Sequence, residues 1–213
     1  MDSHDLPYKS INIIDTNLAN CVDCYRCVRA CPVKAIRVTG GHARVESDLC
    51  IQCGTCVHEC PQQAKIIYPS LGEVKDLIES GARVAVSIAP SFPAAFPGWK
   101  SNRIPSALRQ LGFFYVGETA DGAEAVSQES LKQMDKGSIF TACPAVVRYI
   151  EQERPAFLDQ MVPVASPMIA HARMLRERLG PDIQVVFIGP CAAKKQEILR
   201  PENRGDVQAV LTF

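Results

Sequence analysis

Residues 21–32 read CVDCYRCVRACP, and residues 50–61 read CIQCGTCVHECP. Both stretches have the spacing Cys-x-x-Cys-x-x-Cys-x-x-x-Cys-Pro, so the chain contains an internal repeat with a period of 29 residues. Three thiolates at this spacing can surround one face of an iron–sulfur cube, and two copies are typical of proteins that carry two [4Fe–4S] clusters. We therefore predict a two-cluster module in the first third of the chain.

The ligand assignment follows from how such pairs fold, because the fourth cysteine of each run ligates the cluster of the other run. The alternative is a pair of four-cysteine zinc sites, which rarely have three cysteines two apart followed by Cys-Pro. Two [4Fe–4S] clusters store one electron each and do no bond chemistry, so we expect an electron-transfer role and assign no catalytic residue. The expected ligands are Cys21, Cys24, Cys27 and Cys60 for one cluster, and Cys50, Cys53, Cys56 and Cys31 for the other.

Composition excludes several classes of function. Lys plus Arg and Asp plus Glu both number 23, and the signs also balance on each side of residue 70, so a nucleic-acid partner is not expected. The segment Met1–Asp5 lacks the basic-then-apolar order of a signal peptide, and no apolar run is long enough for a membrane span. We expect a cytoplasmic protein whose partner is a redox protein or a downstream signalling domain.

Beyond residue 70 the pattern alternates between strand-like and helical runs, which indicates a parallel α/β sheet. The expected fold is an α+β ferredoxin-like module at residues 1–70, followed at 71–213 by an α/β parallel-sheet lobe, with the junction at 69–73. Strands are expected at 84–88, 113–116, 138–141, 162–164, 184–188 and 207–211. Helices are expected at 73–80, 103–111, 123–136, 144–153 and 167–179.

Two further cysteines, Cys143 and Cys191, each lie beside a proline after a strand-like run. Functional groups of parallel sheets collect at the carboxyl ends of the strands, so the two thiols could converge on one metal centre. The alternative is a pair of inert cysteines that pack as small hydrophobic residues.

The sequence around these cysteines resembles the [FeFe] (iron-only) hydrogenase large subunit. Residues 141–145 read TACPA and residues 189–197 read GPCAAKKQE, similar to the family motifs T-S-C-C-P and M-P-C-T-A-K-K-x-E. Both follow a two-cluster module, as in that family, so the resemblance covers nearly the whole chain. SIAPSFP at residues 87–93 is similar to the sensory branch of the family, in which a hydrogenase-like domain reports to a signalling domain.

The resemblance implies roles for three residues of the second lobe. Cys143 and Cys191 match two of the four thiolates that hold the H-cluster, a [4Fe–4S] cube joined to a di-iron unit. Lys194 matches the lysine whose ammonium donates to an iron-bound cyanide, although a solvated helix start is the alternative for this side chain.

The sequence departs from the family pattern in three ways. No third motif with two further cysteines is present, and the chain stops at Phe213 within a strand-like run, so we expect a truncated sequence that supplies half of the H-cluster thiolates. Ala142 stands where hydrogen-producing members have a proton-relaying cysteine, and alanine has no exchangeable proton. Glu129 is a candidate relay residue, with a solvated helix face as the alternative.

Three hypotheses follow. The first is the N-terminal part of an [FeFe]-hydrogenase-like protein, sensory and slow, that passes electrons through two [4Fe–4S] clusters to or from an H-cluster lobe. The second is a self-contained ferredoxin-like electron carrier, in which Cys143 and Cys191 are dispensable. The third is an iron–sulfur assembly factor.

Overall fold

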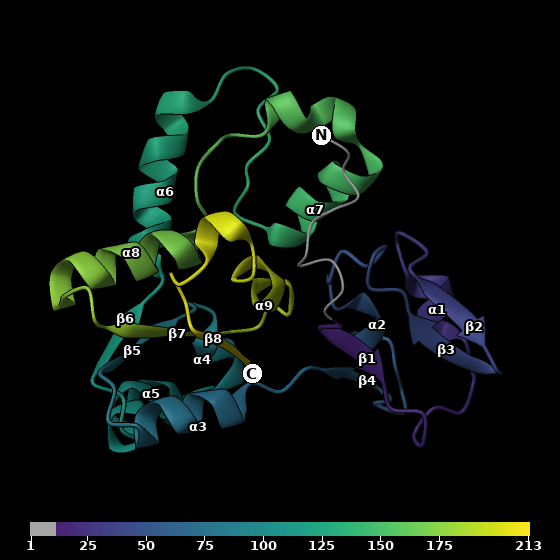
Figure 1. Cartoon of the computed structure of the whole chain (residues 1–213), viewed down its shortest axis with the longest axis horizontal. Coiled ribbons are helices and arrows are strands. Elements are labelled where there is room, and N and C mark those ends of the chain that lie inside the picture. Colours follow the sequence, from purple (N-terminus) through teal and green to yellow (C-terminus); the bar gives the residue numbers. More distant parts are fainter. Residues whose placement is uncertain (1–11) are drawn as a thin grey trace.

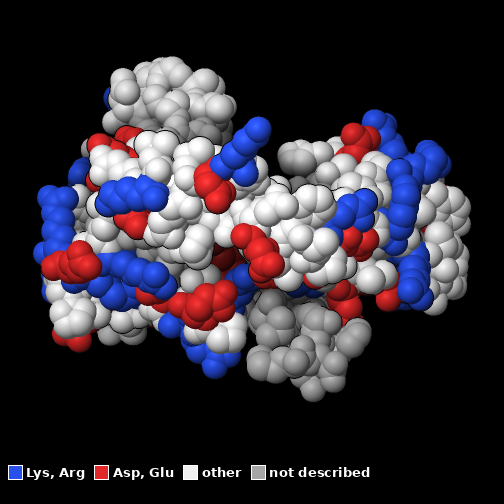
Figure 2. Space-filling model, turned by 90° about the horizontal axis from the view of Figure 1, so that it is seen from above, with Lys and Arg blue, Asp and Glu red and all other residues white. Residues whose placement is uncertain are grey.

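A computed structural model describes residues 12–213, and these form two parts that lie side by side along the long axis of the molecule (Figure 1). On the face seen in Figure 2, Lys and Arg side chains are interspersed with Asp and Glu side chains. The segment Met1–Asp5, on which the signal-peptide prediction rests, lies outside the described residues. Within residues 12–213, no helix is long and apolar enough to cross a membrane.

The N-terminal part consists of two small antiparallel sheets and two short helices. Strand β1 pairs with β4, and β2 pairs with β3, so the strand after each cysteine run folds back in an antiparallel pair. The elements are β1 (Ile14–Thr16), α1 (Arg26–Ala30), β2 (Ile36–Thr39), β3 (His42–Val45), α2 (Thr55–His58) and β4 (Lys65–Ile67).

The 29-residue repeat is also present in the backbone. Each copy places three residues in the left-handed region at matching positions, and five of the six are not glycine. A left-handed residue with a side chain costs roughly 1–2 kcal/mol, so these turns need compensation from what they enclose. The matched pairs are Asp23 with Gln52 (φ 54° and 58°), Tyr25 with Gly54 (55° and 80°) and Lys34 with Gln63 (56° and 50°).

The C-terminal part contains a four-stranded parallel sheet in the order β6-β5-β7-β8. Its strands are β5 (Val84–Ile88), β6 (Tyr115–Glu118), β7 (Gln184–Gly189) and β8 (Ala209–Thr212). The α-helices are α3 (Leu71–Glu79), α4 (Phe92–Ala95), α5 (Trp99–Gln110), α6 (Ala120–Gln133), α7 (Pro144–Glu153), α8 (Pro167–Leu179) and α9 (Ala193–Glu197). Two 3-10 helices, η1 (Pro155–Gln160) and η2 (Pro201–Asn203), complete the lobe.

Helices cover both faces of this sheet, with α6 and α8 on one side and α3 and α5 on the other (Figure 1). All five residues of β5 are buried and four of them are apolar, as in a parallel strand that is covered on both faces. Ala85 packs in one core with Ile169 of α8, whereas Val84 and Val86 pack in a second core with Val74 of α3. Alternate residues of one strand therefore serve two cores.

Two predicted strands, at 138–141 and 162–164, are wrong. Neither segment joins the sheet, and one isolated bridge connects Ile139 to Met161. Two backbone hydrogen bonds of Ile139 join the segments, to Gln160 (2.7 Å) and Val162 (2.9 Å). The Thr141 hydroxyl adds to them by donating to the carbonyl oxygens of Val162 (3.0 Å) and Val164 (2.8 Å). The predicted helices at 144–153 and 167–179 have the observed bounds of α7 and α8.

Candidate metal centres

The eight repeat cysteines surround two separate cavities, each lined by three cysteines of one run and one of the other. These are the two groups expected from the crossed pattern, although the ligand roles themselves stay a prediction. One cavity is lined by Cys21, Cys24, Cys27 and Cys60, and the other by Cys31, Cys50, Cys53 and Cys56.

Backbone N–H groups point at the crossing cysteines in the same way in both copies. The amide of Ala35 donates to Sγ of Cys31 at 3.2 Å, and the amide of Ala64 donates to Sγ of Cys60 at 3.2 Å. Such N–H donors stabilise thiolate sulfur and raise the reduction potential of a bound cluster.

Burial opposes ionisation of several of these thiols when no metal is bound. It raises the pKa of Cys27 and Cys50, and it raises that of Cys56 to about 12. Burial would also raise the pKa of Cys60, but three backbone N–H groups and the charge of Lys65 outweigh it and lower the value. A metal takes the thiolate form and displaces the proton, so cluster binding relieves this cost.

The module also buries a cation that fits a negatively charged group. Lys65 is 4% exposed, and its ammonium donates to Thr16 Oγ1 and to the Ala43 carbonyl oxygen, at 2.7 Å for the latter. Within residues 12–213 no carboxylate forms an ion pair with it. Because a buried charge needs a counter-charge, the cavity fits an iron–sulfur cluster with its four thiolates.

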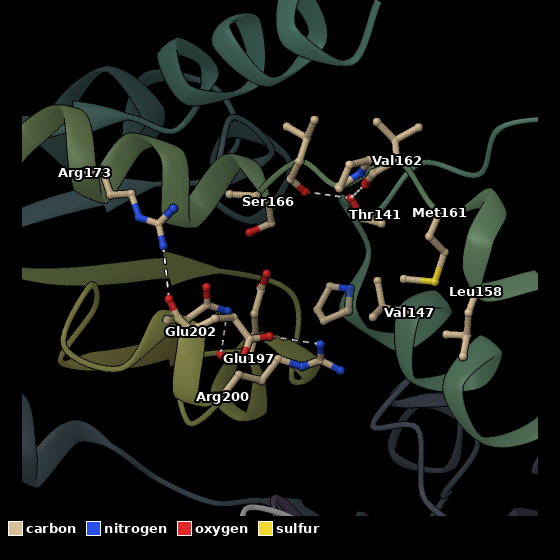
Figure 3. Close-up of a pocket in the computed structure, with 15 residues that line it drawn as sticks. Thr141, Val147, Leu158, Met161, Val162, Ser166, Arg173, Glu197, Arg200 and Glu202 are labelled. Carbon is tan, nitrogen blue, oxygen red and sulfur yellow. Dashed lines mark hydrogen bonds and ion pairs between the residues drawn. The ribbon is translucent and has the colours of Figure 1, made fainter. Parts of the chain in front are cut away.

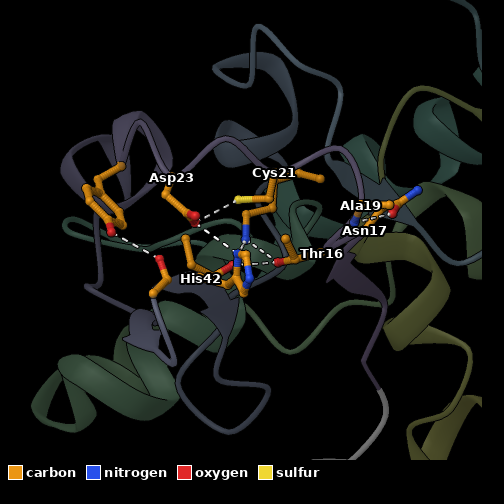
Figure 4. Close-up of polar contacts among 10 residues, drawn as sticks. Thr16, Asn17, Ala19, Cys21, Asp23 and His42 are labelled. Carbon is orange, nitrogen blue, oxygen red and sulfur yellow. Dashed lines mark hydrogen bonds and ion pairs between the residues drawn. The ribbon is translucent and has the colours of Figure 1, made fainter.

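A second polar group lies at the rim of the first cavity (Figure 4). Sγ of Cys21 lies 3.4 Å from Asp23 Oδ1, and His42 Nδ1 lies 3.1 Å from the same oxygen. These three side chains could hold a single metal ion. Since Cys21 also lines the four-cysteine cavity, the two arrangements compete for one sulfur.

Helix α7 connects the second cavity to the α/β lobe. The buried Arg148 donates to the Ser47 carbonyl oxygen at 2.8 Å, and Gln152 donates to the Asp48 carbonyl oxygen at 2.6 Å. Burial raises the pKa of Cys50, and the charge of Arg148 partly opposes this rise. No role was predicted for Arg148, because its contacts are with residues about 100 positions away in the sequence.

Cys143 occupies the N-cap of α7, and Cys191 follows β7 at the carboxyl end of the sheet. Lys194, three residues after Cys191, contacts the residue before Cys143: its ammonium donates to the Ala142 carbonyl oxygen at 3.3 Å and to Glu197 Oε2 at 2.6 Å. Lys194 is 8% exposed, so it is not the solvated helix start of the alternative interpretation. Glu197, for which no role was predicted, is the ion-pair partner of Lys194.

Glu129 lies on the exposed face of α6. It accepts from Gln133 Nε2 at 2.6 Å and from Lys132 Nζ at 3.0 Å, and the first of these hydrogen bonds is the main cause of its lowered pKa. This arrangement matches the solvated helix face and gives no support to a relay role.

A cavity of about 490 Å³ adjoins the Cys143 region (Figure 3). Its lining includes Thr141, Pro144, Arg173 and Glu197. Ser166 is 3% exposed, and its hydroxyl has no hydrogen-bond partner among the described residues. The cavity therefore combines apolar walls with a few buried polar groups, as ligand sites do.

The paired cavities and the folded-back strands define an iron–sulfur electron-transfer protein with two [4Fe–4S] clusters. Residues 13–75 match the 4Fe-4S dicluster domain, and residues 82–213 match the family described as "Iron only hydrogenase large subunit, C-terminal domain". The second match covers more than half of the chain, which therefore belongs to the iron-only hydrogenase large-subunit family.

Curated relatives include two hydrogenase subunits. The chain is 28% identical to the periplasmic [Fe] hydrogenase large subunit of Nitratidesulfovibrio vulgaris, over 95% of this chain and 56% of the relative. It is also 28% identical to the NADP-reducing hydrogenase subunit HndD of Solidesulfovibrio fructosivorans, over 97% of this chain and 36% of the relative. The chain thus spans about half or less of the relatives it matches.

A third relative is the cytosolic Fe-S cluster assembly factor NAR1 of Vanderwaltozyma polyspora, 34% identical over 49% of this chain and 21% of the relative. Among solved structures, a variant of [FeFe]-hydrogenase HydA1 from Chlamydomonas reinhardtii matches with a TM-score of 0.59 and 21% identity. That match covers 68% of this chain and 45% of the other chain, and it shows a shared fold.

Proposed function

We propose that this chain passes electrons between a redox partner and a metal centre held in the α/β lobe by Cys143 and Cys191, as part of a hydrogenase-like protein. The observation that carries the proposal is the course of α7. Its N-cap is Cys143, and five residues further on Arg148 is hydrogen-bonded to the loop before Cys50. One helix thus runs from Cys143 to the second cluster cavity.

In this proposal the eight repeat cysteines hold the two clusters in the crossed arrangement, and the boundary between the domains lies after residue 70. Cys143 and Cys191 would supply two thiolates of an H-cluster. The chemistry that such a cluster supplies is the interconversion of molecular hydrogen with two protons and two electrons. Lys194, already fixed by Glu197, would present its ammonium to an anionic ligand of that centre.

The finer proposal is a slow, sensory protein. Ala142 offers only its carbonyl oxygen to Lys194, and its side chain has no proton to relay. Glu129, the other relay candidate, is paired on an exposed helix face. Poor proton supply favours reporting a redox state over rapid turnover. Cytoplasmic localisation stays a prediction, because the names of the relatives point to both periplasm and cytosol.

The test compares the native-length protein with its Cys143→Ser and Cys191→Ser variants, purified without oxygen. We expect iron and sulfide beyond the two module clusters in the wild type, and loss of that excess and of its electron paramagnetic resonance (EPR) signal in both variants. Ser166→Ala, which changes the neighbouring cavity without removing a thiolate, is the matched control. Identical spectra in all four proteins would contradict the proposal and favour a self-contained electron carrier.

The similarity to NAR1 supports a second candidate, an assembly factor that passes clusters to other proteins. Transfer requires that clusters leave the chain. A labelled-iron experiment separates the two: an electron carrier keeps its ⁵⁷Fe when mixed with an apo-ferredoxin acceptor, and an assembly factor loses it.

A further inference from the structure

The two copies of the cysteine repeat differ in charge at one matched, buried position. A shift of 29 residues places Lys65 on Ile36, and both lie in the strand that follows their own cysteine run. Both side chains are buried, at 4% and 6% exposure, and each lines one of the two cysteine cavities. The left-handed backbone positions and the N–H···S contacts of the fourth cysteines agree between the copies, so the exchange of lysine for isoleucine breaks an otherwise repeated arrangement.

The cation is held in place by neutral groups. Thr16 Oγ1 and the Ala43 carbonyl oxygen both accept from the Lys65 ammonium, and the Thr16 hydroxyl donates to the same carbonyl at 2.7 Å. Thr16 and Ala43 line the Lys65 cavity as well. No carboxylate in residues 12–213 forms an ion pair with Lys65, so its charge is not cancelled locally.

Lys65 lines the cavity of Cys21, Cys24, Cys27 and Cys60, and it does not line the cavity of Cys31, Cys50, Cys53 and Cys56. The residue before it, Ala64, donates its amide N–H to Sγ of Cys60, so the lysine follows directly on a contact with that cysteine. Because the interaction between charges weakens with distance, the ammonium acts more strongly on the first cavity than on the second.

We propose that Lys65 makes the two clusters electronically unequal, by raising the reduction potential of the cluster bound by Cys21, Cys24, Cys27 and Cys60 more than that of its neighbour. This inference rests on the proposed ligand assignment. Reduction adds one negative charge to a cluster, and a buried ammonium stabilises that added charge strongly because little solvent screens it. Ile36 gives the other cavity no such stabilisation.

Another cation complicates the wild-type order of potentials. Arg148 approaches Cys50 from the α/β lobe and acts on the second cluster. The informative quantity is therefore the change in each potential when Lys65 is replaced, measured in one protein with Arg148 intact.

The experiment is an EPR-monitored redox titration of the wild type and of Lys65→Met, which keeps the length of the side chain and removes its charge. We expect both one-electron potentials to be measurable, with one moving clearly to more negative values and the other moving less. Lys65→Arg should restore the wild-type potentials in part, because it keeps the charge. Lys65→Gln, which can still donate to Thr16, is the second neutral variant if the methionine variant assembles poorly.

The control is Arg44→Met, which removes a cation from the exposed face of the neighbouring strand β3 and should leave both potentials nearly unchanged. Unchanged potentials in both neutral variants, or equal shifts of the two clusters, would overturn the inference. Iron and sulfide analysis separates this from failure of the proposed function: about eight irons per chain in the module mean that the clusters are present, and a much lower content means that the ligand assignment is wrong.

Discussion

The two parts of the molecule are stabilised by different means. The α/β lobe has two aliphatic cores, one on each face of its sheet, built from branched side chains such as Ile169, Ile183 and Val186. The core of the module instead includes four of the cysteines, and its helices have five and four residues. So small a core rarely stabilises a fold by itself. We therefore expect the folded module to depend on bound metal, whereas the lobe is stabilised by its aliphatic cores.

Removing iron is the strongest way to separate the two parts. We expect an iron chelator under reducing conditions to unfold β1–β4 while β5–β8 stay folded, because the left-handed turns and buried thiols then lose their compensation. Hydrogen exchange read by mass spectrometry would show loss of protection in residues 12–68 alone. Continued protection there would mean that the module has a sufficient core of its own.

A cavity in the lobe should have the reverse effect. Ile169→Ala removes a side chain that is 0% exposed, and we expect the free energy of unfolding of the lobe to fall by about 2–5 kcal/mol. The visible absorbance of the clusters should persist at temperatures where the lobe has lost its circular dichroism. Leu131→Ala, at a site that is 69% exposed, is the control and should change stability by less than about 0.5 kcal/mol.

The connection between the parts should be intermediate in strength. Arg148→Gln removes a charged donor to the Ser47 carbonyl oxygen, and we expect a loss of about 1–3 kcal/mol in the local stability of that contact. Faster hydrogen exchange at residues 46–50 would report it. Arg176→Gln breaks similar bonds to the carbonyl oxygens of Gly205 and Asp206 within the lobe, and should leave residues 46–50 unaffected.

The smallest effect concerns pH and the lobe alone. Burial lowers the pKa of His171, partly opposed by Asp121, and its Nδ1 lies 2.8 Å from Ser87 Oγ. The unfolded chain therefore takes up a proton at a higher pH than the folded lobe, so stability is full above about pH 6.5 and falls as the pH drops below it. Unfolding measured between about pH 7 and about pH 5 should show a shallower slope for His171→Gln. An equal slope would mean that other groups dominate.

Sequence alone predicted those elements whose signals are local. Pro144 and Pro167 each open a helix at the first turn, and the bounds of α7 and α8 followed from them. The prediction of strands at 138–141 and 162–164 was wrong because β-branched residues there, such as Val162 and Val164, line a cavity instead of pairing within the sheet.

The candidate site shows the same division. The cysteine grouping was visible in the spacing, and the structure brings those residues together. Lys65 was missed although aligning the two repeat copies would have found it, since a lysine stands where the first copy has Ile36. Arg148 gave no such signal, because its contacts join residues far apart in the chain.

The crossing of the fourth cysteines has a consequence for synthesis on the ribosome. The first cavity is completed by Cys60. Its other three thiols, on Cys21, Cys24 and Cys27, are synthesised earlier and leave the exit tunnel before Cys60 does. From Cys27 to Cys60 translation takes about 2–7 s at about 5–20 residues per second. During that interval the nascent chain exposes several free thiols, which can oxidise or form wrong disulfides. A reducing environment and a donor of iron–sulfur clusters are therefore required during synthesis, before the protein transfers any electron.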